Sequence, residues 1–598
     1  MQRRTDTEKL ASMILLRCIV MSSLLALSAS CSNSRGLRHL DPSLIHNGRP
    51  TEAEAYSDFL IARFAAMTND PQKAAEHYAL AIDTAPEKSG IADRALFASL
   101  LSGDYREGVR LAQRANTLGS EAALVRLTLA VEALRVGRDD EARQMLEQTR
   151  FGPFNRMIAR GLSAWRVVDT QGTDAAVRYL EDGLSGDPRL DSATLYMMGL
   201  IEMSAGNDDT ALSVFNTLWE SGARLAVGVE AHAQLLASRG QRAEALEILN
   251  TFDETVGHNA SIARLRQAIE AGERIKVRRL DPDEGAALAV YVPAAALMSQ
   301  TDDDVSAVYF VLALALDSDL HVARSLWAQS LSNAERWDEA ISVLARIPEA
   351  SAFYATSRGQ IAWALQRSGR SQSALAVAAE ALDHSPDRGL KVQLADLYRA
   401  VGRQAQAEEL LDQIIREDAR HNREDWRLFF ARGVSRGELG DWADGERDLL
   451  KALTLEPDDA SLLNYVGYSY VDRGEHLDLA MDMIRRAAEM EPNAGYIIDS
   501  LGWAHYRLGN YDQATEHLER AVELEPGDPV VNDHLGDAYW QTGRKLEARF
   551  QWRRSLTLDP TDGERDRIEA KLVAGPSIPL VKQAESDAGA QLPKPVRP

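Results

Sequence analysis

Apolar positions recur at helical spacing through most of this 598-residue chain, and the pattern is clearest between residues 425 and 560. Within that stretch the apolar residues are three and four positions apart, which predicts helices with one apolar face. Three landmarks repeat at one and the same interval: Gly502 and Gly536, Ala514 and Ala548, and Pro526 and Pro560. An interval of about 34 residues is typical of repeated units of two antiparallel helices each.

The residue types at these landmarks indicate how the units pack. Gly and Ala allow two helices to approach closely, large apolar side chains fill the gaps between them, and Pro marks the turn into the next unit. One helix pair cannot bury its apolar face alone, so neighbouring pairs must stack. The order Leu-Gly, aromatic, Gly, Ala, Pro in residues 501–526 and 535–560 is the tetratricopeptide pattern. We therefore expect an all-α tetratricopeptide-repeat α-solenoid, a superhelix of about 14 helix pairs.

The same interval predicts the domain organisation. A small residue falls at six upstream positions that keep nearly this spacing: Ala74, Gly108, Ala142, Ala176, Ala211 and Ala245. We expect an N-terminal stack over 55–259, a middle stack over 287–420 and a regular C-terminal block over 421–560. Residues 561–574 are predicted to form a polar capping helix, since an exposed solenoid end needs a cover. Residues 575–598 contain five prolines and are expected to be a disordered tail.

Residues 260–286 do not fit the interval. They are expected to form one helix, roughly Ser261 to Ile275, followed by a polar stretch that ends at Pro282. Two interpretations are open: a hinge or break between two stacks, or a degenerate repeat with a shortened loop.

The N-terminus has the features of an export signal. Four basic residues precede an apolar run from Cys18 to Ala29, which is too short to span a bilayer. Translation could begin at Met1 or Met13. Residues 1–30 are therefore predicted to be a signal peptide, and residues 31–54 a polar, flexible tether.

The end of the apolar run, Leu27 to Cys31, resembles the bacterial lipobox, in which small residues precede a cysteine that is lipidated. The usual leucine falls three positions before the cysteine, where this chain has Ser28. The alternative is ordinary cleavage after Ala29, which would give a soluble periplasmic protein. Ser32 after the cysteine favours, by the same resemblance, the outer membrane over the inner one. We expect a lipoprotein that is anchored through Cys31 and has no transmembrane helix.

Charge and motif content exclude several functions. The net charge of −23 disfavours a nucleic-acid partner, because such binding depends on Lys and Arg at phosphates. The acidity fits either a solvated outer face or a groove for a basic partner. No catalytic or phosphate-binding motif is present, and both cysteines, Cys18 and Cys31, precede the first predicted repeat. We expect no enzyme activity, no cofactor and no metal site; an unrecognised catalytic site in the repeats is the remaining alternative.

A partner groove is predicted on the first helices of the last three units. The expected inward positions combine aromatic rings with acids and one amide, a mixture that suits an extended peptide. The alternative is that some of these rings pack between helices. The candidates are Asn464, Tyr468, Asp499, Trp503, Tyr506, Asp533, Asp537 and Trp540.

The runs Leu463–Tyr468, Ile498–Trp503 and His534–Trp540 resemble bacterial outer-membrane tetratricopeptide lipoproteins. They look especially like a subgroup that includes an adaptor for a periplasmic C-terminal processing protease, which presents cell-wall hydrolases to that protease. The resemblance implies a non-catalytic scaffold that raises the local concentration of protease and substrate. The alternative is a scaffold of an envelope machine for exopolysaccharide export, pilus assembly or outer-membrane protein assembly.

Overall fold

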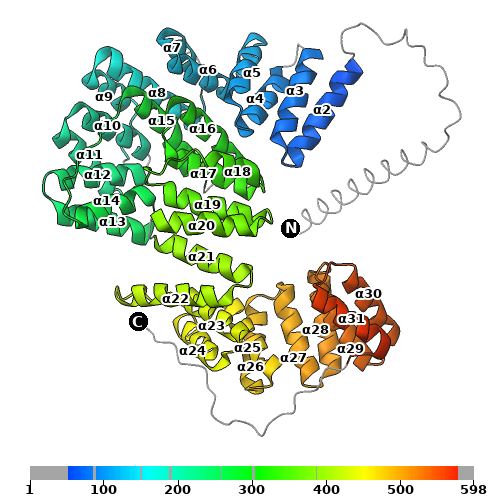
Figure 1. Ribbon diagram of the computed structural model, residues 1–598. Helices are drawn as coiled ribbons and strands as arrows, with labels where there is room; N and C mark the ends of the chain where they lie inside the picture. Colours follow the sequence, from blue (N-terminus) through cyan, green and yellow to red (C-terminus); the bar gives the residue numbers. More distant parts are fainter. Residues whose placement is uncertain are drawn as a thin grey trace, which may run out of the picture. The chain divides into compact units, whose positions relative to one another are not determined.

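The structure is a computed structural model that describes residues 52–84, 89–147, 151–187, 191–257, 259–298, 303–384 and 387–576. The predicted signal peptide, Cys31, nearly all of the tether and the tail beyond residue 576 lie outside the described residues. The described residues form thirty helices and no strand (Figure 1). The prediction of an all-α solenoid built from helix pairs is confirmed.

The chain divides into two compact units, Met1–Val125 and Arg126–Pro598. In the first unit each helix packs against the next one along the chain. Its close approaches use small residues: a Cβ at Gly108 of α5 would lie 2.7 Å from a methyl carbon of Leu100 in α4. The helices are α2 (Glu52–Met67), α3 (Pro71–Thr84), α4 (Ser89–Leu101) and α5 (Tyr105–Thr117), and α6 (Ala123–Arg135) spans the division.

The second unit begins with further pairs and then departs from them. A single helix, α14, follows the last of these pairs, and an extended segment leads from it into α15. The helices are α7 (Asp139–Glu147), α8 (Pro153–Gln171), α9 (Thr173–Glu181), α10 (Ser192–Ala205), α11 (Asp208–Glu220), α12 (Ala226–Ser238), α13 (Arg242–Thr255), α14 (Ala260–Glu270) and α15 (Pro282–Leu297).

Helix α15 returns to pack along α8, which lies much earlier in the chain (Figure 1). Glycines make this approach possible. Gly285 faces the indole of Trp165 so closely that no Cβ would fit, and a Cβ at Gly161 would lie 2.7 Å from that of Ala289. The irregular stretch therefore carries the chain back onto an earlier helix instead of extending the row of pairs.

Regular pairing resumes after α15 and continues to the end of the described residues. The helices are α16 (Asp303–Leu316), α17 (His321–Asn333), α18 (Trp337–Leu344), α19 (Tyr354–Arg367), α20 (Ser371–His384), α21 (Arg388–Ala400), α22 (Gln404–Ala419), α23 (Trp426–Leu439), α24 (Trp442–Leu455), α25 (Ala460–Arg473), α26 (Leu477–Met490), α27 (Gly495–Arg507), α28 (Tyr511–Leu524), α29 (Pro529–Gln541), α30 (Lys545–Leu556) and α31 (Asp562–Ala574). The last helix occupies the range in which a capping helix is expected.

The small landmark residues lie where the two helices of a pair cross. Ala514 and Ala548 are fully buried, and a Cβ at Gly445 would lie 2.8 Å from the carbonyl oxygen of Gly433. The turn inside a pair also needs glycine: Gly509 has φ of 82°, a left-handed conformation that costs glycine little. The repeat interval thus records steric requirements that recur once in each pair.

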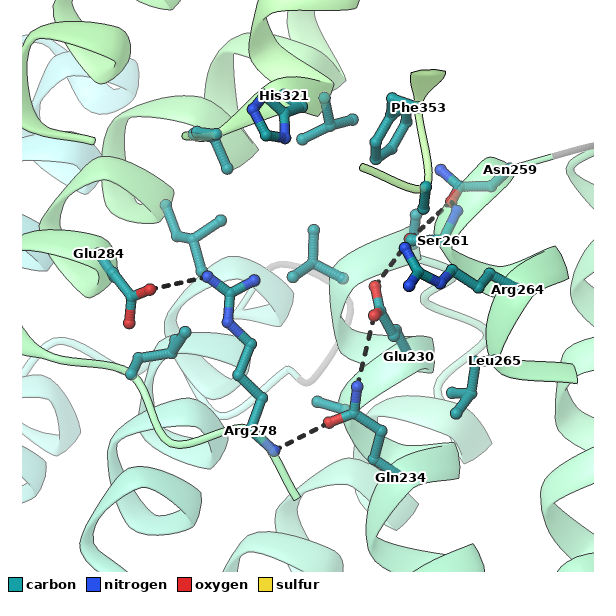
Figure 2. A pocket seen from close by; sticks show the side chains of 18 of the residues that line it. Glu230, Gln234, Asn259, Ser261, Arg264, Leu265, Arg278, Glu284, His321 and Phe353 are labelled. Carbon is teal, nitrogen blue, oxygen red and sulfur yellow. Dashed lines mark hydrogen bonds and ion pairs between the residues drawn. The ribbon is translucent and has the colours of Figure 1, made fainter. Parts of the chain in front are cut away.

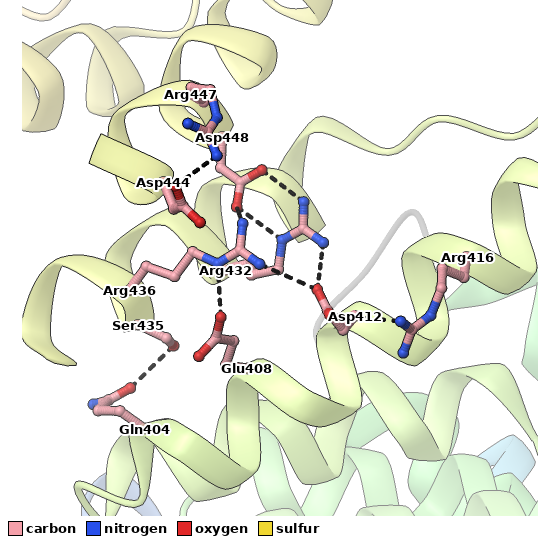
Figure 3. Close-up of polar contacts among 10 residues, drawn as sticks. All are labelled: Gln404, Glu408, Asp412, Arg416, Arg432, Ser435, Arg436, Asp444, Arg447 and Asp448. Atoms are coloured by element: carbon pink, nitrogen blue, oxygen red, sulfur yellow. Dashed lines mark hydrogen bonds and ion pairs between the residues drawn. The ribbon is translucent and has the colours of Figure 1, made fainter. Parts of the chain in front are cut away.

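A partly buried polar network joins α22, α23 and α24, across the boundary expected between the middle stack and the C-terminal block (Figure 3). Asp448, which is buried, accepts hydrogen bonds from Arg432 at 2.6 and 2.8 Å and from Arg436 at 2.8 Å. Arg432 also donates to Asp412 of α22 at 2.5 Å, and Arg436 donates to Glu408 at 2.7 Å. Because every charge in this set has a partner, it connects the two regions through ion pairs as well as apolar packing.

Candidate functional site

A cavity of about 630 Å³ lies where the repeat interval breaks (Figure 2). It is lined by residues of α10, α12, α14, α15, the first turn of α17, the extended segment that follows α14, and the loops at 317–320 and 351–353. These elements come from both sides of the crossover into α15. The cavity therefore exists because the chain leaves the regular stacking at this point.

The extended segment, residues 273–281, is fixed by side chains of earlier helices. Arg278 donates its backbone N–H to Gln234 Oε1 at 3.2 Å, and Leu280 donates its own to Ser204 Oγ at 3.1 Å. The guanidinium of Arg279 binds Asp208 at 2.5 Å and also the carbonyl of Met203. These bonds hold the segment across α10, α11 and α12. A hinge role for it stays a prediction.

One wall of the cavity holds the Glu230 carboxylate. It accepts a hydrogen bond from Ser261 Oγ at 2.8 Å and one from Gln234 Nε2 at 3.4 Å. Burial raises the pKa of the Glu230 carboxyl, while the Ser261 hydrogen bond and the charge of Arg278 act in the opposite direction. Figure 2 shows how these contacts continue through Gln234 to the backbone of Arg278.

Basic side chains also line the cavity. Arg278 forms an ion pair with Glu284 at 2.8 Å, and Arg264 donates to the carbonyl of Ala350 at 2.8 Å. Arg274 and Lys276 are exposed and form no ion pair or hydrogen bond with other described residues. These two cations thus have no ion-pair partner among the described residues, although four carboxylates also line the cavity: Glu230, Glu284, Asp317 and Asp319.

The far side of the cavity is less polar. Phe353 and Leu320 contribute apolar surface, and His321 lies beside them (Figure 2). Burial lowers the pKa of His321, so the imidazole is neutral near pH 7. Burial also raises the pKa of Asp317, although a hydrogen bond from the Asp319 N–H offsets part of that effect. Hydrogen-bonding groups, cations and apolar surface together suit a peptide better than a small apolar ligand.

The eight groove candidates lie on α25, α27 and α29, the helices expected for them. Most are interior: Asp537 is fully buried, and Asn464, Asp499, Trp503 and Tyr506 are at least 93% buried. The remaining three are half-buried: Tyr468, Asp533 and Trp540. A role of these residues in binding a partner stays a prediction.

The structure brings several of the candidates together. Trp503 stacks on Tyr506 with ring centroids 4.9 Å apart, and on His534 with centroids 4.0 Å apart. His534 Nδ1 lies 2.9 Å from Asp499 Oδ2, and this carboxylate counteracts the burial that would otherwise lower the pKa of the imidazole, so that the pKa is raised. Asn464 joins no such cluster, and its buried side-chain oxygen has no hydrogen-bond partner among the described residues.

Lys571 of α31 connects the remaining acidic candidates. Its Nζ lies 2.7 Å from Asp533 and 2.7 Å from Asp537. Trp552 Nε1 also donates to Asp537, at 3.0 Å. The predicted site residues did not include Lys571 or His534, although the repeat interval relates each of them to a predicted aspartate. Asp537 precedes Lys571, and Asp499 precedes His534, by close to one repeat.

The described residues contain no group of three or more His, Cys, Asp or Glu side chains arranged to hold a metal ion. Among the described helices, none is both long enough and apolar enough to cross a membrane.

Residues 497–528, which cover nearly all of α27 and α28, match the tetratricopeptide repeat model. The chain is similar to a TPR repeat-containing protein of Pseudomonas aeruginosa, with 31% identity over 25% of this chain and 25% of the relative. It is also similar to the Lipoprotein NlpI homolog of Haemophilus influenzae, with 34% identity over 17% of this chain and 33% of the relative. The chain thus spans only a quarter to a third of the length of these relatives.

Two solved structures resemble the fold at low similarity. The APC/C hetero-tetramer Cut9-Hcn1 has a TM-score of 0.38 and 14% identity, covering 87% of this chain and 96% of that one. Yeast Tom70 has a TM-score of 0.35 and 15% identity, covering 70% of this chain and 95% of that one.

Proposed function

We propose that this protein is a non-catalytic scaffold of the bacterial envelope that binds protein partners, among them a periplasmic protease or a cell-wall hydrolase. The observation that carries the proposal is the cavity at the crossover. It is large enough for several side chains of a peptide, and it combines apolar surface with hydrogen-bonding groups and cations. A row of stacked helix pairs is a rigid support for such a site, because each pair is held by its neighbours.

Anchoring through a lipid on Cys31 belongs to the same proposal. The similarity to a lipoprotein of Haemophilus influenzae supports it, as does the lipobox-like end of the apolar run. An anchored scaffold would keep bound partners close to the membrane and to one another, which raises their effective concentration without any new contact. Cys31→Ser should move the protein from the membrane fraction to the soluble fraction of the envelope. A membrane fraction that is unchanged in this variant would contradict the anchor.

The partner-binding part is tested by affinity capture from an envelope extract, with the full-length protein as bait. Ala268→Trp places a large ring in the cavity wall, where the native side chain is half-buried, and is expected to abolish capture. Thr557→Trp, at an exposed position after α30, is the matched control and should leave capture unchanged. Recovery of a protease or hydrolase with wild type alone supports the proposal. Recovery of only export or assembly components would contradict the protease and hydrolase partners and favour an assembly scaffold.

A further inference from the structure

The extended segment displays its basic residues with a period of two. Arg274, Lys276 and Arg278 line the cavity at alternate positions of a non-helical stretch, and Ile275 between the first two lines it as well. Alternate side chains of an extended chain point to one side, about 6.6–6.8 Å apart. The segment therefore presents a row of three cations along one wall of the cavity.

Two of these cations are available to a ligand. Arg278 is engaged by Glu284 at 2.8 Å, whereas neither Arg274 nor Lys276 has a partner among the described residues. Arg264 adds a third positive charge from α14, and among the described residues it donates to a neutral carbonyl, that of Ala350.

Four carboxylates also line the cavity, those of Glu230, Glu284, Asp317 and Asp319, and other groups contact the first three. Glu230 accepts hydrogen bonds from Ser261 and Gln234. Glu284 binds Arg278 and also accepts the N–H of Asp281 at 3.0 Å. Asp317 accepts the N–H of Asp319 at 2.8 Å. None of these carboxylates forms an ion pair with the two free cations of the extended segment.

We propose that the cavity binds an extended peptide segment of a partner protein that carries acidic side chains at alternate positions. This inference rests on the proposed scaffold function and specifies the chemistry of its ligand. An extended peptide alongside residues 274–278 has the same two-residue period, so successive carboxylates meet successive cations. Its intervening side chains then face the apolar surface near Phe353 and Leu320.

Fluorescence anisotropy with two labelled peptides tests the inference on the full-length protein. In one peptide glutamate and valine alternate; the other has the same composition, with all glutamates before all valines. We expect the alternating peptide to bind about tenfold more tightly than the block peptide, and Arg274→Gln/Lys276→Gln to remove about tenfold of that affinity. Arg549→Gln/Arg553→Gln, which removes two exposed cations of α30, is the charge-matched control and should change nothing.

Equal binding of the two peptides would overturn the inference, because it would show attraction without register. Equal losses in the two double variants would overturn it as well, since net charge alone would then explain the binding. A different result distinguishes failure of this inference from failure of the proposed function. If neither peptide binds while Ala268→Trp still abolishes capture of envelope proteins, the acidic-peptide inference is wrong and the scaffold function stands.

Discussion

The indole of Trp503 lies flat against the imidazole of His534, with 4.0 Å between ring centroids and 16° between the ring planes. The two residues belong to α27 and α29, the first helices of successive pairs. Asp499 holds the imidazole through Nδ1 at 2.9 Å, so the ring cannot turn away from the indole without losing an ion pair. This stack is therefore a joint between neighbouring repeats.

Trp503→Ala should weaken that joint. The indole is 95% buried, and its removal leaves a cavity, so the free energy of unfolding should fall by about 3–5 kcal/mol. Trp363→Ala, at a ring that is half exposed, should cost under about 1 kcal/mol. Urea unfolding monitored by circular dichroism compares the two. A Trp503→Ala protein as stable as the control would refute the packing role.

Lys571→Met should leave two acids without their cation. Asp537 is fully buried and Asp533 is half-buried, so the unfolding free energy should fall by about 3–5 kcal/mol. Lys545→Met removes an exposed lysine and is the control. Adding Asp537→Asn to Lys571→Met should restore part of the loss, because it removes the unpaired charge. Without that partial restoration, the effect of Lys571 would not be electrostatic.

His232 should make stability depend on pH. It is buried beside Phe215, its Nε2 has no hydrogen-bond partner among the described residues, and burial lowers its pKa to about 4. Below the unfolded-state pKa of about 6.5, the unfolded chain gains a proton that the folded protein does not take up until about pH 4. Stability from this group is thus present above pH 6.5 and lost as the pH falls, by up to about 3 kcal/mol at pH 4.

The pH prediction is checked with His232→Leu. Unfolding free energies of the two proteins, measured from pH 7 to pH 4, should differ most in slope between pH 6.5 and 4, with the variant losing less stability. Parallel curves would mean that His232 titrates alike in the folded and unfolded chain.

Two glycines in one helix pair should respond oppositely to alanine. Gly445→Ala brings a methyl group to within 2.8 Å of a backbone oxygen in α23, so it should destabilise the protein by about 1–3 kcal/mol. Gly437→Ala meets nothing closer than 3.9 Å and should stabilise the helix by about 0.5–1 kcal/mol. Melting temperatures of both variants decide the matter. Stabilisation by Gly445→Ala would show that α23 and α24 have room for a methyl group where they cross.

Arg279→Ala should loosen the crossover. It removes the contacts to Asp208 and to the Met203 carbonyl, which hold the extended segment on α10 and α11. Amide hydrogen exchange of residues 273–281 should become faster, while exchange in α27 stays unchanged. Arg239→Ala, which breaks a more exposed ion pair with Asp209 at the neighbouring position, is the control. Unchanged exchange in the Arg279 variant would show that the other bonds suffice to fix the segment.

The sequence alone determined the repeating part of this protein. A steric requirement such as room for Ala514 against a facing helix recurs in every pair, so it leaves a periodic signal that one chain reveals. The same interval already contained the contacts from Asp499 to His534 and from Asp537 to Lys571. It could not show that Trp503 lies in the interior, because an aromatic ring on the first helix of a pair suits a groove and a helix interface equally well.

The tertiary structure alone decided the crossover and its cavity. Residues 273–281 have no periodic signal, since what fixes them are single hydrogen bonds to Gln234 and Ser204, on helices much earlier in the chain. The return of α15 onto α8 depends on the fit of Gly285 to Trp165, a contact between helices that are far apart in the sequence. A contact that recurs in every repeat produces a periodic pattern of residue types, which the sequence reveals. A contact made once between distant residues produces no such pattern, so only the folded structure reveals it.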